Sequence, residues 1–242
     1  MKKFLSSFTA LAVFLLNFLA YTPSAFANPS FARTEAGDIR IEINGHVYTI
    51  YSSDRAIGAF NSFSNVAGET INSVQASSDH TALFRVIGVE PSTIFGALNA
   101  NSHIFLVNPN GVLFGQGSQV NAPGLVVSGL NISNENFLNK NYLFEGTGAD
   151  GGFVLNQGNL SSAQGGYLAL IGKAVRNEGT IQAVGGQAVL RAAERRHLDL
   201  PGHAAHRALH LYRVGGHRLP VGGQPVLHRL RGLRGDAGAG AP

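Results

Sequence analysis

The run Val154-Leu155-Asn156-Gln157-Gly158-Asn159-Leu160 returns 21 residues later as Val175-Arg176-Asn177-Glu178-Gly179-Thr180-Ile181. In the same region, Gly165-Gly166 returns 20 residues later as Gly185-Gly186. A period near 20 residues, with short strands and no helix, is typical of one coil of a parallel β-helix. Val, Leu and Ile would point inward, while Asn and Gly would form corners that need a positive φ. The alternative is two unrelated hairpins that share Asn-x-Gly.

The rest of the region from residue 28 to residue 190 also has β character. Residues 38–43 and 46–51 alternate apolar and polar positions on either side of Asn44-Gly45, which predicts a β-hairpin with a type I′ turn. No long stretch shows helical periodicity. The 31 glycines and the low charged fraction of 13% favour tightly turned strands. We therefore predict an all-β fold whose coils stack, because one coil cannot bury its apolar face alone.

The net charge of +4 is unevenly distributed along the chain. Residues 28–190 contain seven Lys/Arg and eleven Asp/Glu, a balance of −4, whereas residues 191–242 contain nine Arg and three Asp/Glu, a balance of +6. Lys2 and Lys3 supply the remaining +2. The central region is thus mildly acidic, and its composition gives no support for a nucleic-acid partner.

The same region offers little chemistry for catalysis or metal binding. The chain has no cysteine, which excludes disulfides, a thiolate nucleophile and a Cys-ligated metal. Metal sites and acid–base pairs need grouped ligands or carboxylates. The histidines and several aspartates are instead scattered: His46, His80, His103, Asp38, Asp54, Asp79 and Asp150. We predict that the region is not an enzyme and holds no cofactor and no metal.

Asn108-Pro109-Asn110-Gly111 has the chemistry of a tight turn after an apolar run. Pro presets φ at the second position, and Asn-Gly tolerates a positive φ. A structural turn alone therefore explains the motif, and direct contact with a partner is the alternative.

The motif and its surroundings, residues 99–121, resemble the haemagglutination-activity, or two-partner-secretion, domain at the N-terminus of filamentous-haemagglutinin-type exoproteins. That family carries an Asn-Pro-Asn-Gly-Ile signature, and this chain has Val112 in place of Ile. Residues 82–86 resemble the family segment that ends Asn-Arg-Val, and residues 123–128 resemble its Gly-Leu-Val-Ala-Ser run. Residues 130–136 are most similar to the high-molecular-weight adhesins.

The resemblance extends from about Ile39 to Leu190, with its motifs in the expected order. Two positions depart from the family pattern. Phe60 stands where the family usually has Trp, which we expect to be a conservative core change, and Arg85 follows Phe84 without the usual intervening Asn.

The resemblance implies a right-handed parallel β-helix with an N-terminal cap and extra β strands outside the helix. It also implies that the domain addresses an adhesin- or haemagglutinin-type exoprotein to an outer-membrane β-barrel transporter, through the transporter's periplasmic POTRA modules. Strand addition to an exposed sheet edge is a compatible mode of recognition. Asn108, Pro109, Asn110 and Gly111 are the candidate recognition residues, and β-helix folding would begin at the cell surface. A region downstream of the domain would contact host cells or glycans.

Residues 1–27 have the three-part layout of a secretory signal peptide. Lys2 and Lys3 precede the apolar residues 4–20, and Ala25-Phe26-Ala27 forms a small-residue cleavage site. We expect the Sec machinery to export the chain, with cleavage between Ala27 and Asn28. An N-terminal membrane anchor is the alternative, although the apolar run is short for a bilayer span.

Residues 191–242 differ abruptly in composition from the domain at residues 28–190. They contain no Ile, Asn, Ser, Thr or Phe, yet they hold nine Arg and six of the nine His. We interpret this Arg/His/Gly-rich tail as disordered or out of frame, with the reading frame lost near Arg191. The rival interpretations are a basic nucleic-acid or membrane arm and a His-rich metal tract.

The sequence therefore predicts a secretion-targeting domain of an exoprotein that is exported through the periplasm to the outer cell surface or the medium. One alternative is a free-standing surface β-helix protein that binds carbohydrate or haem. Another is a polysaccharide-degrading β-helix enzyme.

Overall fold

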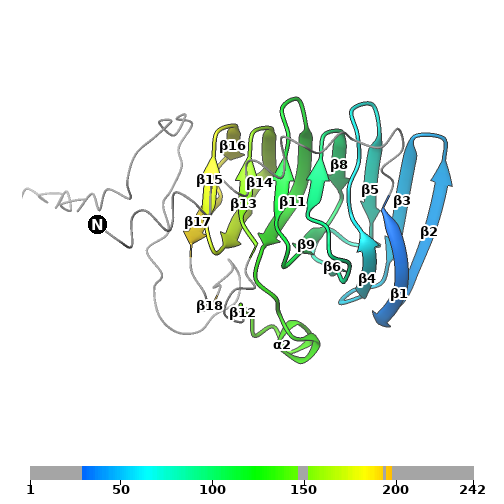
Figure 1. The fold of residues 1–242 in the computed structure, drawn as a ribbon. Helices are drawn as coiled ribbons and strands as arrows, with labels where there is room; N and C mark the ends of the chain where they lie inside the picture. The colour runs from blue at the N-terminus through cyan, green and yellow to red at the C-terminus, as the bar shows by residue number, and fades with distance from the viewer. Residues whose placement is uncertain (1–28, 147–151, 193–194, 198–242) are drawn as a thin grey trace, which may run out of the picture.

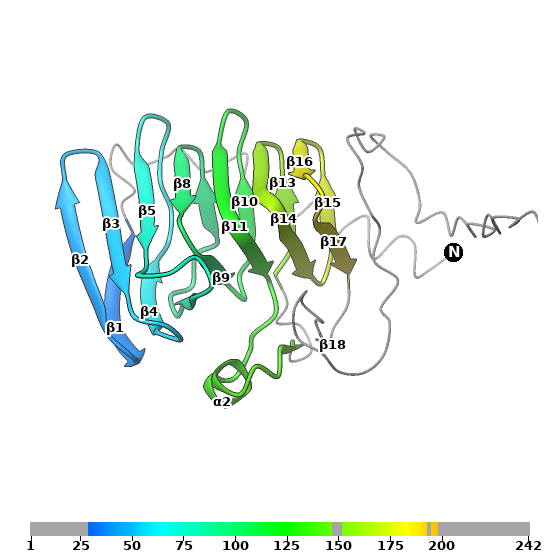
Figure 2. The same ribbon diagram turned by 180° about the vertical axis from the view of Figure 1, so that it is seen from behind.

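The computed structural model describes residues 29–146, 152–192 and 195–197. The expected signal peptide with its cleavage site at Ala27 and Asn28, and most of the tail, lie outside these residues. Within them, short strands wind into a β-helix of about 6 turns (Figure 1, Figure 2). This architecture confirms the predicted all-β parallel β-helix.

Three columns of parallel strands form the faces of the helix. The first face contains β3 (Val47–Ser52), β5 (Thr70–Val74), β8 (Ala97–Ala100), the first halves of β11 (Gln119–Ser128) and β14 (Asn159–Gly172), and β16 (Thr180–Ala183). The second face contains β4 (Ile57–Ser62), β6 (Thr81–Val86), β9 (His103–Val107), the second halves of β11 and β14, and β17 (Gln187–Ala192). The third face contains β7 (Ser92–Ile94), β10 (Val112–Phe114), β13 (Val154–Asn156) and β15 (Val175–Asn177).

The internal repeat lies where one coil stacks on the next. Val154 of β13 pairs with Val175 of β15, and Asn156 pairs with Asn177 in the same register. The Asn156 Nδ2 atom donates a hydrogen bond to Asn177 Oδ1 at 2.7 Å. Because these pairs have the same 21-residue offset as the sequence repeat, the structure confirms that the repeat unit is one coil.

Two antiparallel strands, β1 (Ser30–Ala36) and β2 (Ile39–Asn44), cap the N-terminal end of the helix. β1 pairs with β4 of the second face, and β2 pairs with β3 of the first face. The partly buried side chains of Phe31, Ile39 and Ile41 pack against the core. The cap therefore covers the first coil, as the family resemblance implied.

The predicted hairpin between β2 and β3 is present, but its turn lies one residue later than expected. Asn44 extends β2 and pairs with Val47, so Gly45 and His46 form the turn. Gly45 has a φ of 57°, and neither Asn44 nor His46 has a positive φ. A type I′ turn needs a positive φ at both central residues, so that prediction was wrong. A positive φ at the first central residue alone fits type II′.

Apolar side chains fill the interior in rows that run from coil to coil. The row on the first face is formed by Tyr48, Ile71, Leu98, Val120, Leu160 and Ile181. Beneath the cap, the rings of Phe60, Phe63 and Phe84 pack with centroids 5.1 to 5.7 Å apart. Phe60 is 0% exposed, in agreement with the core role expected for it.

Residues 129–146 leave the helix after β11, and we call them the excursion. They contain α2 (Asn134–Leu138) and β12 (Leu143–Glu145), which pairs antiparallel with β18 (Arg195–His197). Buried side chains of the excursion cover outward-facing residues of the second face; these side chains are Leu130, Ile132, Phe137, Tyr142 and Phe144. Stacking resumes in register afterwards, because Val112 pairs with Val154. The excursion therefore supplies the predicted strands outside the helix.

The aromatic cluster beneath the cap yields a stability prediction. Phe84 is 0% exposed and contacts both Phe60 and Phe63, so Phe84→Ala should lower the free energy of unfolding by about 3–5 kcal/mol. The exposed Val184, with 52% of its surface accessible, provides the control, because Val184→Ala should change it by less than about 0.5 kcal/mol. Urea denaturation followed by circular dichroism measures both, and equal effects would contradict the packing described.

Candidate functional site

The side chain of Asn108 lies inside the corner between β9 and β10 and holds that corner together. It is 0% exposed. Its Nδ2 atom donates to the carbonyl oxygen of Glu90 at 3.0 Å and to Ser92 Oγ at 3.0 Å. Its Oδ1 atom accepts from the backbone N–H of Asn110 at 2.9 Å and from Asn110 Nδ2 at 3.1 Å. An asparagine side chain has two donors and two acceptor sites, and all four are used.

Gly111 closes the same turn in a conformation that only glycine adopts readily. Its φ is 114°, and its N–H donates to the carbonyl of Asn108 at 2.9 Å. The carbonyl of Gly111 accepts from the N–H of Ser92 at 2.9 Å. The next coil approaches closely here, since a Cβ atom added to Gly152 would lie 2.5 Å from Gly111 Cα. The structure therefore explains Asn108 and Gly111 as parts of a tightly packed corner.

Asn110 faces outward and braces a second loop. Its Nδ2 atom donates to the carbonyl of Gly88 at 2.8 Å. The loop of residues 87–91 displays two apolar side chains, Ile87 at 43% and Val89 at 83% exposure. Gly88 is packed so closely that an added Cβ would lie 2.0 Å from the carbonyl oxygen of Asn61. We call residues 87–91 and 108–111 together the motif corner; it is a braced surface with apolar side chains.

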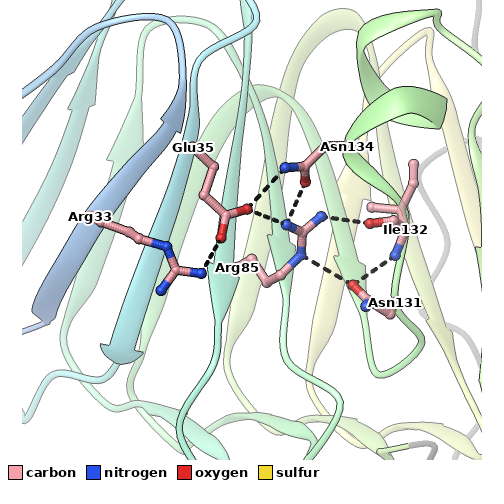
Figure 3. Close-up of polar contacts among 6 residues, drawn as sticks. All are labelled: Arg33, Glu35, Arg85, Asn131, Ile132 and Asn134. Carbon is pink, nitrogen blue, oxygen red and sulfur yellow. Dashed lines mark hydrogen bonds and ion pairs between the residues drawn. The ribbon is translucent and has the colours of Figure 1, made fainter.

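A second polar cluster, around Arg85, was not singled out as a site by the sequence (Figure 3). The Arg85 side chain is only 11% exposed, and its Nη1 atom lies 2.7 Å from Glu35 Oε2. The same guanidinium donates to Asn134 Oδ1 at 2.6 Å, to the carbonyl of Ile132 at 2.5 Å and to Asn131 Oδ1 at 3.1 Å. We call this cluster the arginine clasp. It joins three parts of the domain: the cap, strand β6 of the second coil, and the excursion.

Burial and charge act in opposite directions on the clasp. Burial lowers the pKa of Arg85, and the carboxylate of Glu35 opposes that shift. Glu35 is itself held, because Arg33 Nη2 donates to its Oε1 atom at 2.7 Å and Asn134 Nδ2 donates to its Oε2 atom at 3.1 Å. A buried ion pair adds little net stability, but removing one partner is costly because it leaves the other charge buried and unpaired. The clasp therefore fixes how cap and excursion sit on the helix.

Arg55 holds the excursion at a second point. Its Nη1 atom donates to the carbonyls of Phe137 and Leu138, at 3.0 Å each. These carbonyls belong to the end of α2, where a cation is favoured by the free carbonyls of the last turn. At the start of the helix, Ser133 Oγ accepts from the N–H of Asn136 at 3.1 Å. Two arginines from early coils thus fasten a segment that lies far along the chain.

The histidines do not form a metal centre in the part of the chain that the structure describes. His80 and His103 lie on neighbouring coils, where the N–H of His103 donates to the carbonyl of His80 at 3.0 Å. The His103 ring stacks on Tyr167, with centroids 5.1 Å apart, and His46 lies in the cap hairpin. Residues 29–146, 152–192 and 195–197 contain no group of three or more His, Cys, Asp or Glu that could hold a metal ion. Nor does any helix among them have the length and apolar content of a membrane span.

Comparisons with known proteins point to one family. The model of the TPS secretion domain matches residues 36–213. A heme/hemopexin-binding protein of Haemophilus influenzae strain Rd is 27% identical over 181 residues, and a protein of the same name from Haemophilus influenzae is 34% identical over 102 residues. These matches cover 70% and 41% of this chain but only 20% and 11% of the relatives, so the chain spans about a fifth of their length or less.

The fold is also similar to a solved structure. The crystal structure of the HMW1 secretion domain from Haemophilus influenzae superposes with a TM-score of 0.68 and 29% sequence identity. The match covers 70% of this chain and 46% of that chain.

The two asparagines of the motif should respond differently to truncation. Asn108→Ala leaves the buried hydrogen-bonding groups of Glu90 and Ser92 without their partner, so the free energy of unfolding should fall by roughly 2–3 kcal/mol. Asn110→Ala should lower it by less than about 1 kcal/mol, since water can replace contacts at an exposed side chain. Urea denaturation of the two variants checks this, and losses of equal size would contradict the division into an inner and an outer asparagine.

The arginine clasp predicts a characteristic set of variants. Arg85→Met leaves the carboxylate of Glu35, whose side chain is only 13% exposed, without the Arg85 partner, which should cost about 3–5 kcal/mol. Arg85→Lys should recover little, because one ammonium group cannot reproduce the forked contacts. The double variant Arg85→Met with Glu35→Leu also removes the unpaired carboxylate, so it should recover part of the lost free energy of unfolding. Thermal and urea denaturation test the series, and wild-type stability of Arg85→Lys would show that a simple charge suffices.

Proposed function

Because this chain belongs to the TPS secretion domain family, we propose that POTRA modules of an outer-membrane transporter recognise it in the periplasm and that it then starts β-helix folding at the cell surface. It is the N-terminal targeting domain of a two-partner-secretion exoprotein, whose partner is an outer-membrane transporter. Such exoproteins are secreted to the cell surface or the extracellular space. The observation that carries the proposal is the cap that closes the N-terminal end of the helix.

One end of the helix is closed by the cap, so further coils can stack only at the other end. The cap strands β1 and β2 cover the first coil. At the other end, β15, β16 and β17 pair with the preceding coil and, among the described residues, with no further strand. Because the cap closes the first coil, stacking can proceed in one direction only, with each coil serving as the template for the next.

The motif corner is proposed as one contact with the transporter. Asn108 and Gly111 would act from inside, by holding the corner in shape. Pro109, Asn110 and the exposed Val89 would present its outer surface. The support is that hydrogen bonds tie down a loop that displays two exposed apolar side chains beside the motif, so a partner could bury them without first having to order the loop.

The proposal also covers the export of the chain and the bounds of its domain. Residues 1–27 direct Sec-dependent export, with cleavage between Ala27 and Asn28, and the domain runs from residue 28 to about residue 190. The family match itself extends to residue 213, and the interpretation of residues 191–242 as out of frame stays a prediction that resequencing tests. The domain is neither an enzyme nor a nucleic-acid-binding protein, and contacts of the adhesin-type exoprotein with host cells or glycans would involve a downstream region.

The relatives are named heme/hemopexin-binding proteins, which favours a second candidate function, in which this protein binds haem or a haem carrier at the surface. A free-standing binding protein of this kind would not depend on a dedicated transporter. Partner dependence therefore separates the two candidates.

Secretion should depend on the transporter and on the outer surface of the motif corner. In a Gram-negative host that produces this chain, we expect it in the medium or on the cell surface only when the cognate transporter is co-expressed. Val89→Asp should lower transporter-dependent secretion about tenfold, which corresponds to about 1.4 kcal/mol of binding. Immunoblots of medium, surface and periplasm measure the distribution.

The matched control is Val184→Asp, which places the same charge at another exposed valine. It should be secreted like the wild type, and both variants should unfold at the wild-type temperature. Secretion without any transporter would favour the free-standing candidate. Equal secretion of the two variants would remove the motif corner as a contact.

A further inference from the structure

The large sheet of the β-helix has four edge strands among the described residues: β1 and β2 in the cap, and β16 and β17 in the last described coil, where a further coil would stack. The strand order runs from β1 to β2 through the faces of the helix. Among the described residues, each of these two strands pairs on one side only. The backbone groups along such an edge can pair with a strand from another chain, and proteins usually protect their edges against this.

β1 is protected and β2 is not. The pairing of β1 with β4 is broken by three register shifts, at Ser30/Phe31, Phe31/Arg33 and Thr34/Ala36. Such irregularities twist an edge and spoil it as a template. β2 instead pairs with β3 over six residues, from Ile39 to Asn44, without any register shift. It contains neither proline nor lysine, and its two charged side chains, Arg40 and Glu42, pair with each other.

The hairpin geometry shows which backbone groups of β2 face outward. In an antiparallel pair, alternate residues exchange hydrogen bonds, and the pair that closes a two-residue turn is one of those that do. Asn44 and Val47 close the turn, and at the other end Asp38 accepts from the N–H of Ser53 at 3.0 Å. The even-numbered residues of β2 therefore bond to β3. The N–H and C=O groups of Ile39, Ile41 and Ile43 point to the free edge.

The side chains along β2 define what an added strand must look like. Ile39 and Ile41 pack against the end of the core, and Ile43 is 60% exposed at its rim. On the other face, Arg40 lies 4.0 Å over the Tyr51 ring and forms an ion pair with Glu42. A neighbouring strand would place apolar side chains beside the isoleucines and polar ones beside Arg40 and Glu42.

We propose that the free edge of β2 is a docking site at which an alternating apolar–polar edge strand of the transporter's periplasmic modules adds to the sheet. This inference rests on the proposed function, which supplies the partner. It goes beyond it by naming the edge, the residues and the mode of binding. β2 lies at the opposite end of the helix from β17 (Figure 1, Figure 2), so a transporter bound to β2 would not obstruct the stacking of further coils beyond β17.

A pair of variants at one exposed position isolates the backbone contribution. Ile43→Pro removes one outward N–H and places a ring at the edge, but it breaks no hydrogen bond to β3, and proline is tolerated at such edge positions. Ile43→Ala removes the same side chain and keeps the N–H. Binding of each full-length variant to the purified periplasmic portion of the cognate transporter is measured by biolayer interferometry, with transporter-dependent secretion as the second readout.

We expect Ile43→Pro to weaken binding about tenfold and Ile43→Ala less than about threefold, because a lost edge contact of about 1.4 kcal/mol corresponds to a factor of ten. Unchanged thermal unfolding of both variants shows that the cap is intact. If both variants bind and are secreted alike while secretion still requires the transporter, strand addition at β2 is wrong and the proposed function stands. If secretion needs no transporter, the proposed function itself fails. Self-association of the wild type that Ile43→Pro abolishes, without an effect on transporter binding, would identify a second copy as the occupant and overturn the inference.

Discussion

The structure depends on one constraint: each strand of a coil satisfies its backbone hydrogen bonds through the coils above and below it. The apolar rows inside follow from this constraint, because in-register stacking brings like positions together, as in the row from Tyr48 to Ile181. Corners must then turn at the same height in every coil. Asn108, Gly111 and the Asn156–Asn177 pair meet that requirement with side-chain hydrogen bonds and a positive φ. At the N-terminal end of the stack there is no further coil to supply these hydrogen bonds.

The cap supplies the missing partners there, and it connects the fold to the proposed role in secretion. At the N-terminal end, β1 and β2 run antiparallel to the coil strands, so the stack cannot simply continue past them. The arginine clasp ties this cap to the excursion through Glu35, Arg85 and Asn134. The cap, the second coil strand and the excursion therefore hold one another in place. An N-terminal end closed in this way leaves the stacking of further coils to the other end.

Local sequence patterns predicted most of the fold, but few of the hydrogen bonds and ion pairs between residues far apart in the sequence. The 21-residue repeat, the cap hairpin and the buried Phe60 follow from spacing, turn chemistry or resemblance, and the structure agrees with them. The predicted hairpin turn was one residue too early, because Asn44 still pairs with Val47 in the β2–β3 ladder. Strand pairing, and not the Asn-Gly dipeptide, sets the position of the turn. The hydrogen bonds of the arginine clasp could not be predicted from local pattern, because the partners of Arg85 lie 46 to 50 residues away from it in the sequence. The one local signal of the clasp was a lone charge in the otherwise apolar segment around residue 85. For the motif, sequence found the right residues but could not tell that Asn108 faces inward and Asn110 outward.

The most direct test of this account is amide hydrogen exchange on the full chain, alone and bound to the transporter's periplasmic portion. A folded, capped helix recognised at its edge predicts fast exchange at Ile39, Ile41 and Ile43 in the free chain and strong protection of these amides in the complex. The coil amides, such as those of Val126 and Val127, should stay protected in both states. Loss of protection throughout the coils on binding would contradict the account, because it would mean that the transporter recognises an unfolded chain.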